Sequence, residues 1–197
     1  ALPIVPRGAG TGLSGGCIPF GGVILSTENL ADISISPRER TAVCGPGVIT
    51  KDLADMAASF GLAYPPDPAR YDESTLGGNV AENAGGLRCK RFGVTRDYIL
   101  GMRGVTSAGE IIETGCYIDN RGFNFSDLII GSEGTLIILT EITVRLINAP
   151  SPGVTILMAF DSVRDAAQTV SEITGAGMIP TVMEFLDGDA AKCSRSE

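Results

Sequence analysis

Short apolar runs alternate with turn-forming residues over the first part of the chain. Residues 1–5 are apolar and predict a strand that leads into a loop over 7–22. Further short strands are predicted at 23–26, 31–35 and 41–44, each ending near Gly, Pro, Asn or Ser. The chain therefore opens with small strands and one long glycine-rich connection.

A helix is predicted after these strands. Thr50 is its expected N-cap, and Gly61 suits the left-handed position that follows a helix end. Four apolar residues recur at the spacing of one helix face: Leu53, Met56, Ala57 and Phe60. This face is expected to pack inward.

The middle of the chain is predicted to be mostly antiparallel. Residues 64–96 show almost no periodicity, and a loop of this length in a compact domain is expected to be functional. Residues 99–105 and 111–113 predict a hairpin, and a long half-buried strand follows from the alternation of Ile142, Val144 and Leu146 with polar residues.

After residue 150 the pattern changes to strand, helix, strand. Strands are predicted at 154–160 and 181–186, with a helix that begins at Ser162 and Asp165 between them. Its inward residues are Ala166, Val170 and Ile173. We expect domain boundaries of 1–150 and 151–197, and since one βαβ unit leaves an apolar face uncovered, we expect self-association or another segment packed there.

Composition and charge place the chain among globular proteins. The 197 residues are 44% hydrophobic and 19% charged. The net charge of −8 and the lack of a basic run argue against nucleic acid as a partner. No apolar stretch is long enough for a membrane span and no leader precedes the first strand, so a cytoplasmic location is expected.

The reactive residue types exclude several mechanisms. There is no histidine, which removes imidazole bases and imidazole metal ligands from this chain. The five cysteines form no C-x-x-C pair, and we expect small buried thiols and no metal site. The 26 glycines are clustered, which indicates close approach of the backbone to something else.

The first cluster, residues 7–16, fits G-x-G-x-x-G at 10–15, yet the residues behind it cannot form the helix that a Rossmann site needs. Its unshielded amides and the hydroxyls of Thr11 and Ser14 instead predict a diphosphate-binding nest. Arg7 can balance the phosphate charge or form a surface salt bridge, and a purely structural turn is the alternative for the whole loop.

Two further clusters stand later in the chain. Small residues dominate 74–86, where backbone can lie flat against a planar group while Ser74, Thr75 and Asn79 donate or accept hydrogen bonds. Residues 131–135 form either a ligand loop or a structural turn. The carboxylates nearby, Asp67, Glu82 and Glu133, are interpreted as turn or cap residues rather than an acid/base pair.

Five motifs occur in the order seen in one flavoprotein family: PRGAGTGLSGG at 6–16, PPDP at 65–68, LGGNVAENAGGLR at 76–88, FGVTRD at 92–97 and GSEGTL at 131–136. The chain thereby resembles FAD-linked oxidases of the vanillyl-alcohol oxidase type, particularly the glycolate oxidase FAD-binding subunit and D-lactate dehydrogenase group. The resemblance implies an α+β fold in which a small α/β part and an antiparallel sheet part bind FAD. A cap domain follows, of which residues 151–197 would be the first βαβ unit. The leading helix and strand of the family's α/β part are expected to be missing.

The resemblance also implies which residues contact FAD. The pyrophosphate would lie on residues of the first cluster: Arg7, Gly8, Ala9, Gly10, Thr11, Gly12, Leu13 and Ser14. The isoalloxazine and ribityl would lie near Pro68, Ser74, Thr75, Gly77, Gly78, Asn79, Ala81 and Gly85. The adenine side or the flavin edge would be near Pro46, Gly47, Gly134 and Ile138, and Ile137 stands where the family usually has glycine. No catalytic residue is implied.

By this resemblance the chain is the FAD-binding module of a D-2-hydroxy-acid dehydrogenase or oxidase acting on CH–OH groups of glycolate- or D-lactate-like substrates. The flavin accepts hydride, an electron-acceptor subunit is the implied partner, and the chain alone is expected to be inactive. The alternatives are a catalytically inert flavin- or nucleotide-binding remnant or subunit in a larger redox assembly, and a cell-wall precursor reductase of the same flavin fold.

The flavin is predicted to be bound non-covalently, because no histidine is present to form a histidyl bond. Acid precipitation of the FAD-loaded protein should leave the yellow colour in the supernatant. Flavin fluorescence that stays in the washed pellet would show a covalent bond, for which Cys17 and Cys89 would be the first thiols to examine.

Overall fold

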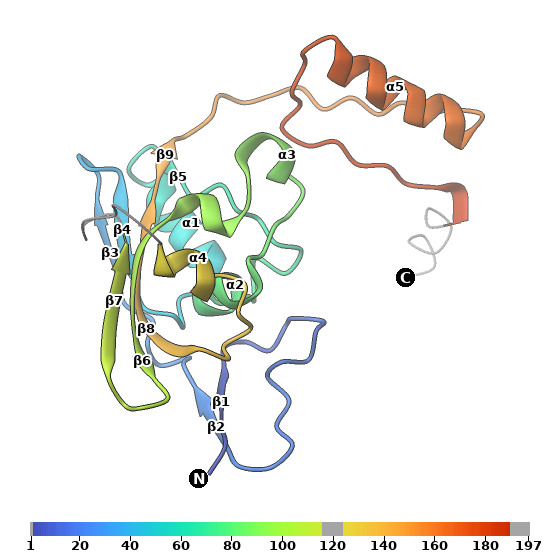
Figure 1. Cartoon of the computed structure of the whole chain (residues 1–197). Helices are drawn as coiled ribbons and strands as arrows, with labels where there is room; N and C mark the ends of the chain where they lie inside the picture. The colour runs from blue at the N-terminus through green and yellow to red at the C-terminus, as the bar shows by residue number, and fades with distance from the viewer. Residues whose placement is uncertain (1, 116–123, 190–197) are drawn as a thin grey trace.

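The computed structural model describes residues 2–115 and 124–189. Figure 1 shows a body of strands and short helices, from which a C-terminal segment, shown in orange and red, projects away with one long helix. Within the described ranges, no helix is long and apolar enough to cross a membrane.

The body is organised by a five-stranded antiparallel sheet (Figure 1). In spatial order its strands are β3 (Ile33–Ser36), β4 (Thr41–Cys44), β8 (Ile137–Arg145), β6 (Ile99–Thr106) and β7 (Ile111–Gly115). The predicted hairpin and the predicted long strand are both confirmed, and they form the β6, β7 and β8 part of this sheet.

The central strand β8 does not alternate strictly. Ile137 and Leu139 are buried, two exposed residues follow, and Ile142 and Val144 are buried again. The pairing with β6 shifts register between Arg103 and Gly104, and such an irregularity lets one strand change which side chains face the core. The sheet therefore presents buried side chains from both halves of β8.

Two small sheets complete the body. β1 (Ile4–Arg7) pairs in parallel with β2 (Val23–Ser26), and β5 (Leu62–Ala63) pairs with β9 (Ile147–Asn148). β2 and β4 match their predicted bounds, and β3 begins two residues and ends one residue later than predicted. β1 lies at 4–7 instead of 1–5, so Arg7 belongs to the strand and not to the loop. The glycine-rich connection consequently runs from the end of one parallel strand to the start of its neighbour.

Helix α1 (Thr50–Ala58) begins one residue before the position expected from its predicted cap. Ile49 is the N-cap, and Thr50 is the first helical residue and fully buried. Its hydroxyl donates to the carbonyl oxygen of Ser74 at 3.0 Å and accepts from Asn79 Nδ2 at 2.6 Å. The Thr50 hydroxyl, which the sequence predicted to cap the helix, therefore bonds to Ser74 and Asn79 instead. The predicted inward face is half right, because Leu53 is buried and Phe60 is exposed.

The prediction of a loop over 64–96 is wrong. This stretch contains α2 (Leu76–Glu82), α3 (Cys89–Phe92) and the 3-10 helix η1 (Thr95–Tyr98). Thr75 caps α2 by accepting from the Gly78 amide at 3.4 Å, and Asn83 ends it in the left-handed conformation. Glycines disfavour a helix by propensity, but close packing compensates: a Cβ on Gly77 would lie 2.7 Å from Pro46 Cβ. A last short helix, α4 (Phe125–Ile129), precedes β8.

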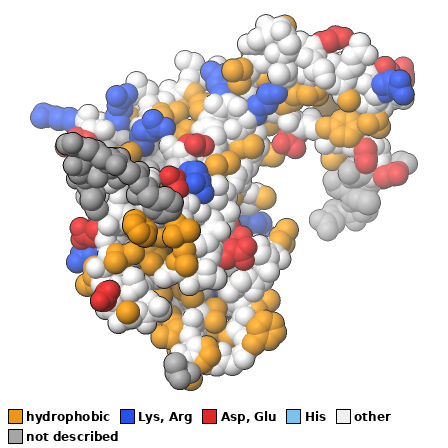
Figure 2. Space-filling model, in the orientation of Figure 1, with side chains coloured by type: hydrophobic (Ala, Val, Ile, Leu, Met, Phe, Trp, Pro, Cys, Tyr) orange, Lys and Arg blue, Asp and Glu red, His pale blue; other side chains and the backbone are white. Residues whose placement is uncertain are grey.

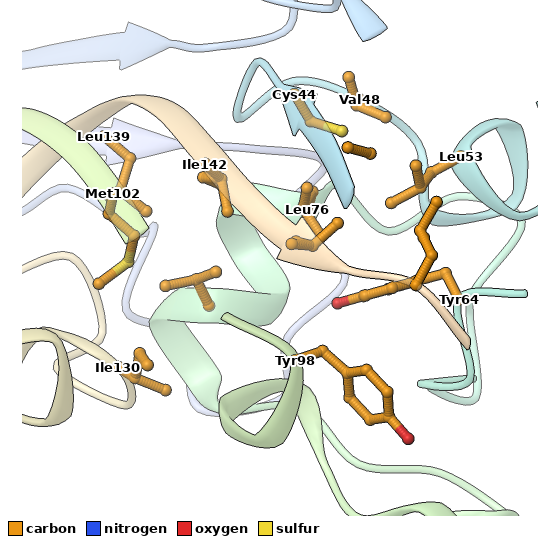
Figure 3. Close-up of a cluster of buried hydrophobic side chains, with 14 of the residues drawn as sticks. Cys44, Val48, Leu53, Tyr64, Leu76, Tyr98, Met102, Ile130, Leu139 and Ile142 are labelled. Carbon is orange, nitrogen blue, oxygen red and sulfur yellow. The ribbon is translucent and has the colours of Figure 1, made fainter. Parts of the chain in front are cut away.

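The core lies where α1 and α2 meet the large sheet. Figure 3 shows Leu53, Leu76 and Ile142 among the side chains that fill it, and all three are fully buried. Tyr64 packs edge-on against Tyr98 with ring centroids 5.9 Å apart. Burial raises the pKa of Tyr64, since a phenolate would be poorly solvated there.

The cysteines only partly match the expectation of buried thiols. Cys44 is buried, which raises its pKa to about 12, and Cys17 is half-buried. Cys89 is exposed on α3, so the expectation is wrong at that position. Cys116 and Cys193 lie outside the described residues.

The C-terminal segment contains the predicted helix without the predicted strands. Helix α5 (Val163–Gly175) begins as expected, with Ser162 Oγ accepting from the Asp165 amide at 3.2 Å. The strands predicted at 154–160 and 181–186 are absent from the described residues, because a strand needs a hydrogen-bonded neighbour that the chain does not provide here. Ala166 is buried as predicted, whereas Val170 is exposed.

Many apolar side chains of this segment face solvent, and Figure 2 shows hydrophobic atoms along it. They include Val154, Ile156, Leu157, Met178, Ile179, Phe185 and Leu186. Two hydrogen bonds join the segment to α3, from Lys90 Nζ to Thr174 Oγ1 and from Arg91 to the Ile179 carbonyl. The domain boundary at 150/151 and the self-association of this face stay predictions.

Thr50→Val should lower the free energy of unfolding by about 1–3 kcal/mol, because it leaves the buried amide of Asn79 without its acceptor. Thr140→Val is the matched control on the exposed face of β8, where a change within about 0.5 kcal/mol is expected. Chemical denaturation of both variants gives the comparison. Equal stabilities would show that the Thr50 hydroxyl does not hold α1 and α2 together.

Candidate functional site

A cavity of about 640 Å³ lies between the glycine-rich loop and helix α2. The segment 68–74 and the start of β8 close its remaining sides. The volume is in the range of small-molecule and cofactor sites, and most of the lining is apolar or glycine. The three sequence clusters, far apart along the chain, therefore meet around one space.

The glycine loop forms the first wall. A Cβ on Gly8 would lie 2.1 Å from Thr75 Oγ1, so the loop approaches the N-cap of α2 more closely than a side chain permits. Gly10 has φ +72°, a conformation that favours glycine, and a Cβ there would lie 2.9 Å from Arg7 Nη2. The loop thus presents backbone without side chains beside one guanidinium group, as an anion site requires.

Helix α2 forms the opposite wall and is rigidly held. Its first amides donate to backbone carbonyls, Leu76 to Val48 at 2.7 Å and Gly77 to Pro46 at 2.8 Å. The side chains of Ser74, Thr75 and Asn79 line the cavity, yet all three are at least 95% buried. Their hydrogen bonds run to Thr50 and to the Gly78 amide. These residues fix the shape of the wall by bonding within the protein.

Two carboxylates, which the sequence assigned to turns or caps, also line the cavity. Ser14 Oγ donates to Glu82 Oε2 at 3.1 Å. Glu133 has φ +53°, and its amide donates to the Ala81 carbonyl at 2.9 Å. Asp67 lies elsewhere, in an ion pair of 3.0 Å with Arg88. Glu133 lies in a turn, as the interpretation expects, whereas Asp67 and Glu82 form contacts with residues far away in the chain.

The structure gathers all but two of the predicted cofactor-binding residues around this cavity. Gly47 instead lines a smaller neighbouring cavity, and its backbone packs closely, since a Cβ there would lie 2.2 Å from the Thr27 carbonyl oxygen. Ile138 is also absent from the lining, whereas Ile137 and Leu139 belong to it. Adjacent residues of a strand face opposite sides, so strand alternation could have identified the latter pair.

Sequence reasoning also missed lining residues that belong to no glycine motif: Cys17, Thr27, Ala69 and Arg70. Glu82 and Glu133 stand inside two of the motifs but were not assigned to the cofactor. Arg70 forms an exposed ion pair with Glu73. Their positions depend on how Thr27 and the segment 68–74 pack against the glycine loop. The local sequence pattern does not reveal this packing.

The lining fits a dinucleotide with a flat ring system. Unshielded backbone, Arg7 and the hydroxyl of Thr11 suit a diphosphate, since anions bind where several donors converge, while the Ser14 hydroxyl is engaged by Glu82. Pro6, Pro46, Ile137 and Leu139 give the apolar surface that a ring requires.

Comparison with known families agrees with this chemistry. Residues 1–115 match the family described as the FAD binding domain. Residues 149–197 match the C-terminal domain of FAD linked oxidases.

Individual relatives agree as well. The chain is 46% identical to the glycolate oxidase subunit GlcD of Bacillus subtilis over 94% of this chain and 40% of that protein. It is 36% identical to a D-lactate dehydrogenase of Archaeoglobus fulgidus over 98% of this chain and 44% of the relative. A solved structure of alkyldihydroxyacetonephosphate synthase superimposes with a TM-score of 0.78 at 26% identity, over 91% of this chain and 36% of that one. The chain spans less than half the length of these relatives.

The motifs, the antiparallel sheet, the cavity and the relatives agree, which confirms the predicted fold class and cofactor. The chain belongs to the FAD-linked oxidases of the vanillyl-alcohol oxidase type and carries their FAD-binding domain.

Proposed function

We propose that this chain is the FAD-binding module of an oxidoreductase that oxidises D-2-hydroxy acids such as glycolate or D-lactate. One observation carries the proposal: the glycine loop with Arg7 and the glycine-rich face of α2 form the two walls of a single cavity. The names of the relatives, a glycolate oxidase subunit and a D-lactate dehydrogenase, support the substrate class.

Each wall has a separate task in this proposal. The loop residues and Arg7 bind the diphosphate of FAD, while the segment 68–85 and Gly134 lie along the isoalloxazine and ribityl. Bound FAD supplies the hydride acceptor, and the protein supplies orientation and electrostatics. Because Ile137 and Leu139 are largely buried, they would shield this part of the cofactor from water.

Substrate oxidation needs two further groups near the flavin: a base for the hydroxyl proton and a cation for the carboxylate. Among the described residues, the charged side chains on the cavity are Arg7, Arg70, Glu82 and Glu133. Arg7 lies against the diphosphate loop and Glu82 accepts from Ser14. We therefore assign cofactor binding to this chain and propose that substrate groups and an electron-acceptor partner come from elsewhere. A cytoplasmic location stays a prediction.

Gly10→Asp tests the diphosphate assignment. The new carboxylate would stand beside Arg7 and neutralise it, so FAD affinity should fall at least about tenfold, the factor for loss of one charge-assisted contact. Gly10→Ala adds a Cβ at the same strained φ without a charge and should bind more tightly than Gly10→Asp. Fluorescence titration with FAD measures both. Wild-type affinity in Gly10→Asp would contradict the assignment.

A graft tests the substrate class. Residues 1–197 replace the matched segment of the Bacillus subtilis glycolate oxidase subunit, and the chimera should oxidise glycolate in an assay with an artificial electron acceptor. The FAD-loaded chain alone, mixed anaerobically with D-lactate or glycolate, should keep its flavin absorbance band, while dithionite should bleach it.

Two outcomes would change the proposal. A chimera that binds FAD but oxidises nothing would favour an inert flavin-binding module. Bleaching of the chain alone by a hydroxy acid would place the catalytic groups within these residues, with Glu82, Glu133 and Arg70 the first to substitute.

A further inference from the structure

The glycine loop has few attachments to the rest of the protein. Within the described residues, one hydrogen bond joins residues 9–17 to another element, and it runs from Ser14 Oγ to Glu82 Oε2 at 3.1 Å. The bond from the Ile18 amide to the Gly15 carbonyl closes a turn inside the loop. Glu82 is therefore the side chain through which α2 is hydrogen-bonded to residues 9–17.

The loop passes directly over this carboxylate. A Cβ on Gly12 would lie 2.9 Å from Glu82 Oε1, so a side chain at this position would collide with the carboxylate that Ser14 contacts. Helix α2 beneath it is fixed through Asn79 and Thr50, whose side chains are buried and bonded to each other at 2.6 Å. The loop is thus hydrogen-bonded to a well-anchored helix through one side chain.

Helix stability does not explain a glutamate at this position. Glu82 is the last residue of α2, and a negative charge at the C-terminal end of a helix is unfavourable. A carboxylate beside a proposed anion site also carries a repulsive cost. The hydrogen bond from Ser14 gives Glu82 a role that explains its presence despite these two unfavourable charge interactions.

We propose that Glu82 is a positioning residue for FAD: through Ser14 it holds the loop 9–17 against α2 and so sets the width of the cavity where the diphosphate binds. This rests on the proposed assignment of the diphosphate to the loop. Glu82 acts on the cofactor through Ser14.

The test compares Glu82→Ala, Glu82→Gln and Ser14→Ala with the double variant. Glu82→Ala should weaken FAD binding about five- to tenfold, the factor for loss of one exposed hydrogen bond to a charged group. Glu82→Gln keeps an acceptor for Ser14 and should stay within about twofold of wild type. The double variant should bind no more weakly than Ser14→Ala, because both changes remove the same contact. Glu39→Ala, in the turn between β3 and β4 at the other end of β8 from Ile137, removes an exposed charge that does not line the cavity and should bind as wild type.

Hydrogen exchange gives a second measurement that does not depend on FAD. The amides of residues 9–17 should exchange faster in Glu82→Ala than in Glu82→Gln, with the same melting temperature in both. Unchanged or tighter FAD binding by Glu82→Ala, or additive losses in the double variant, would overturn the proposal. If the wild-type chain binds no FAD, the proposed function fails, and the exchange rates still decide whether Glu82 tethers the loop.

Discussion

The buried hydroxyl of Thr50 is the contact on which the arrangement of the site depends. It donates to the Ser74 carbonyl and accepts from the Asn79 side chain, so one oxygen joins the start of α1, the segment before α2 and α2 itself. The group is fully buried, and a buried polar atom without partners is costly. The three elements therefore keep one relative position, and α2 can act as a fixed wall for the cavity.

The absence of Cβ atoms at the glycines determines how closely the glycine loop approaches α2. Any side chain at Gly8 would collide with Thr75, and any side chain at Gly77 would collide with Pro46. Glycine at these points costs conformational entropy, which the packing around α2 has to offset. In return, the backbone of the loop and of α2 lines the cavity at positions where side chains would collide. Because glycines have no side chains, the loop makes few side-chain contacts. The bond between Ser14 and Glu82 therefore has a large influence on the position of the loop.

The body buries its apolar side chains, whereas the C-terminal segment leaves most of its apolar side chains exposed. In the body, Leu53, Leu76 and Ile142 come from different elements and bury one another completely. In the segment after residue 150, α5 forms because its cap and periodicity are local, while the flanking stretches have no neighbouring strand to pair with. Local signals are thus sufficient for a helix, whereas a strand depends on a partner.

The sequence by itself determined the family, the cofactor and most residues of the cavity. Glycines at 8–16 and 77–85 mark backbone that lies close to other groups, and this signal is local. It also determined β2, β4 and the β6–β7 hairpin, where alternation and turn residues agree. Tertiary structure decided that 76–82 is a helix, that Ile137 and Leu139 rather than Ile138 face the cavity, and that Glu82 meets Ser14. These outcomes depend on contacts between residues far apart in the chain, and such contacts outweigh local propensity because they bury side chains and satisfy hydrogen bonds that no local pattern records.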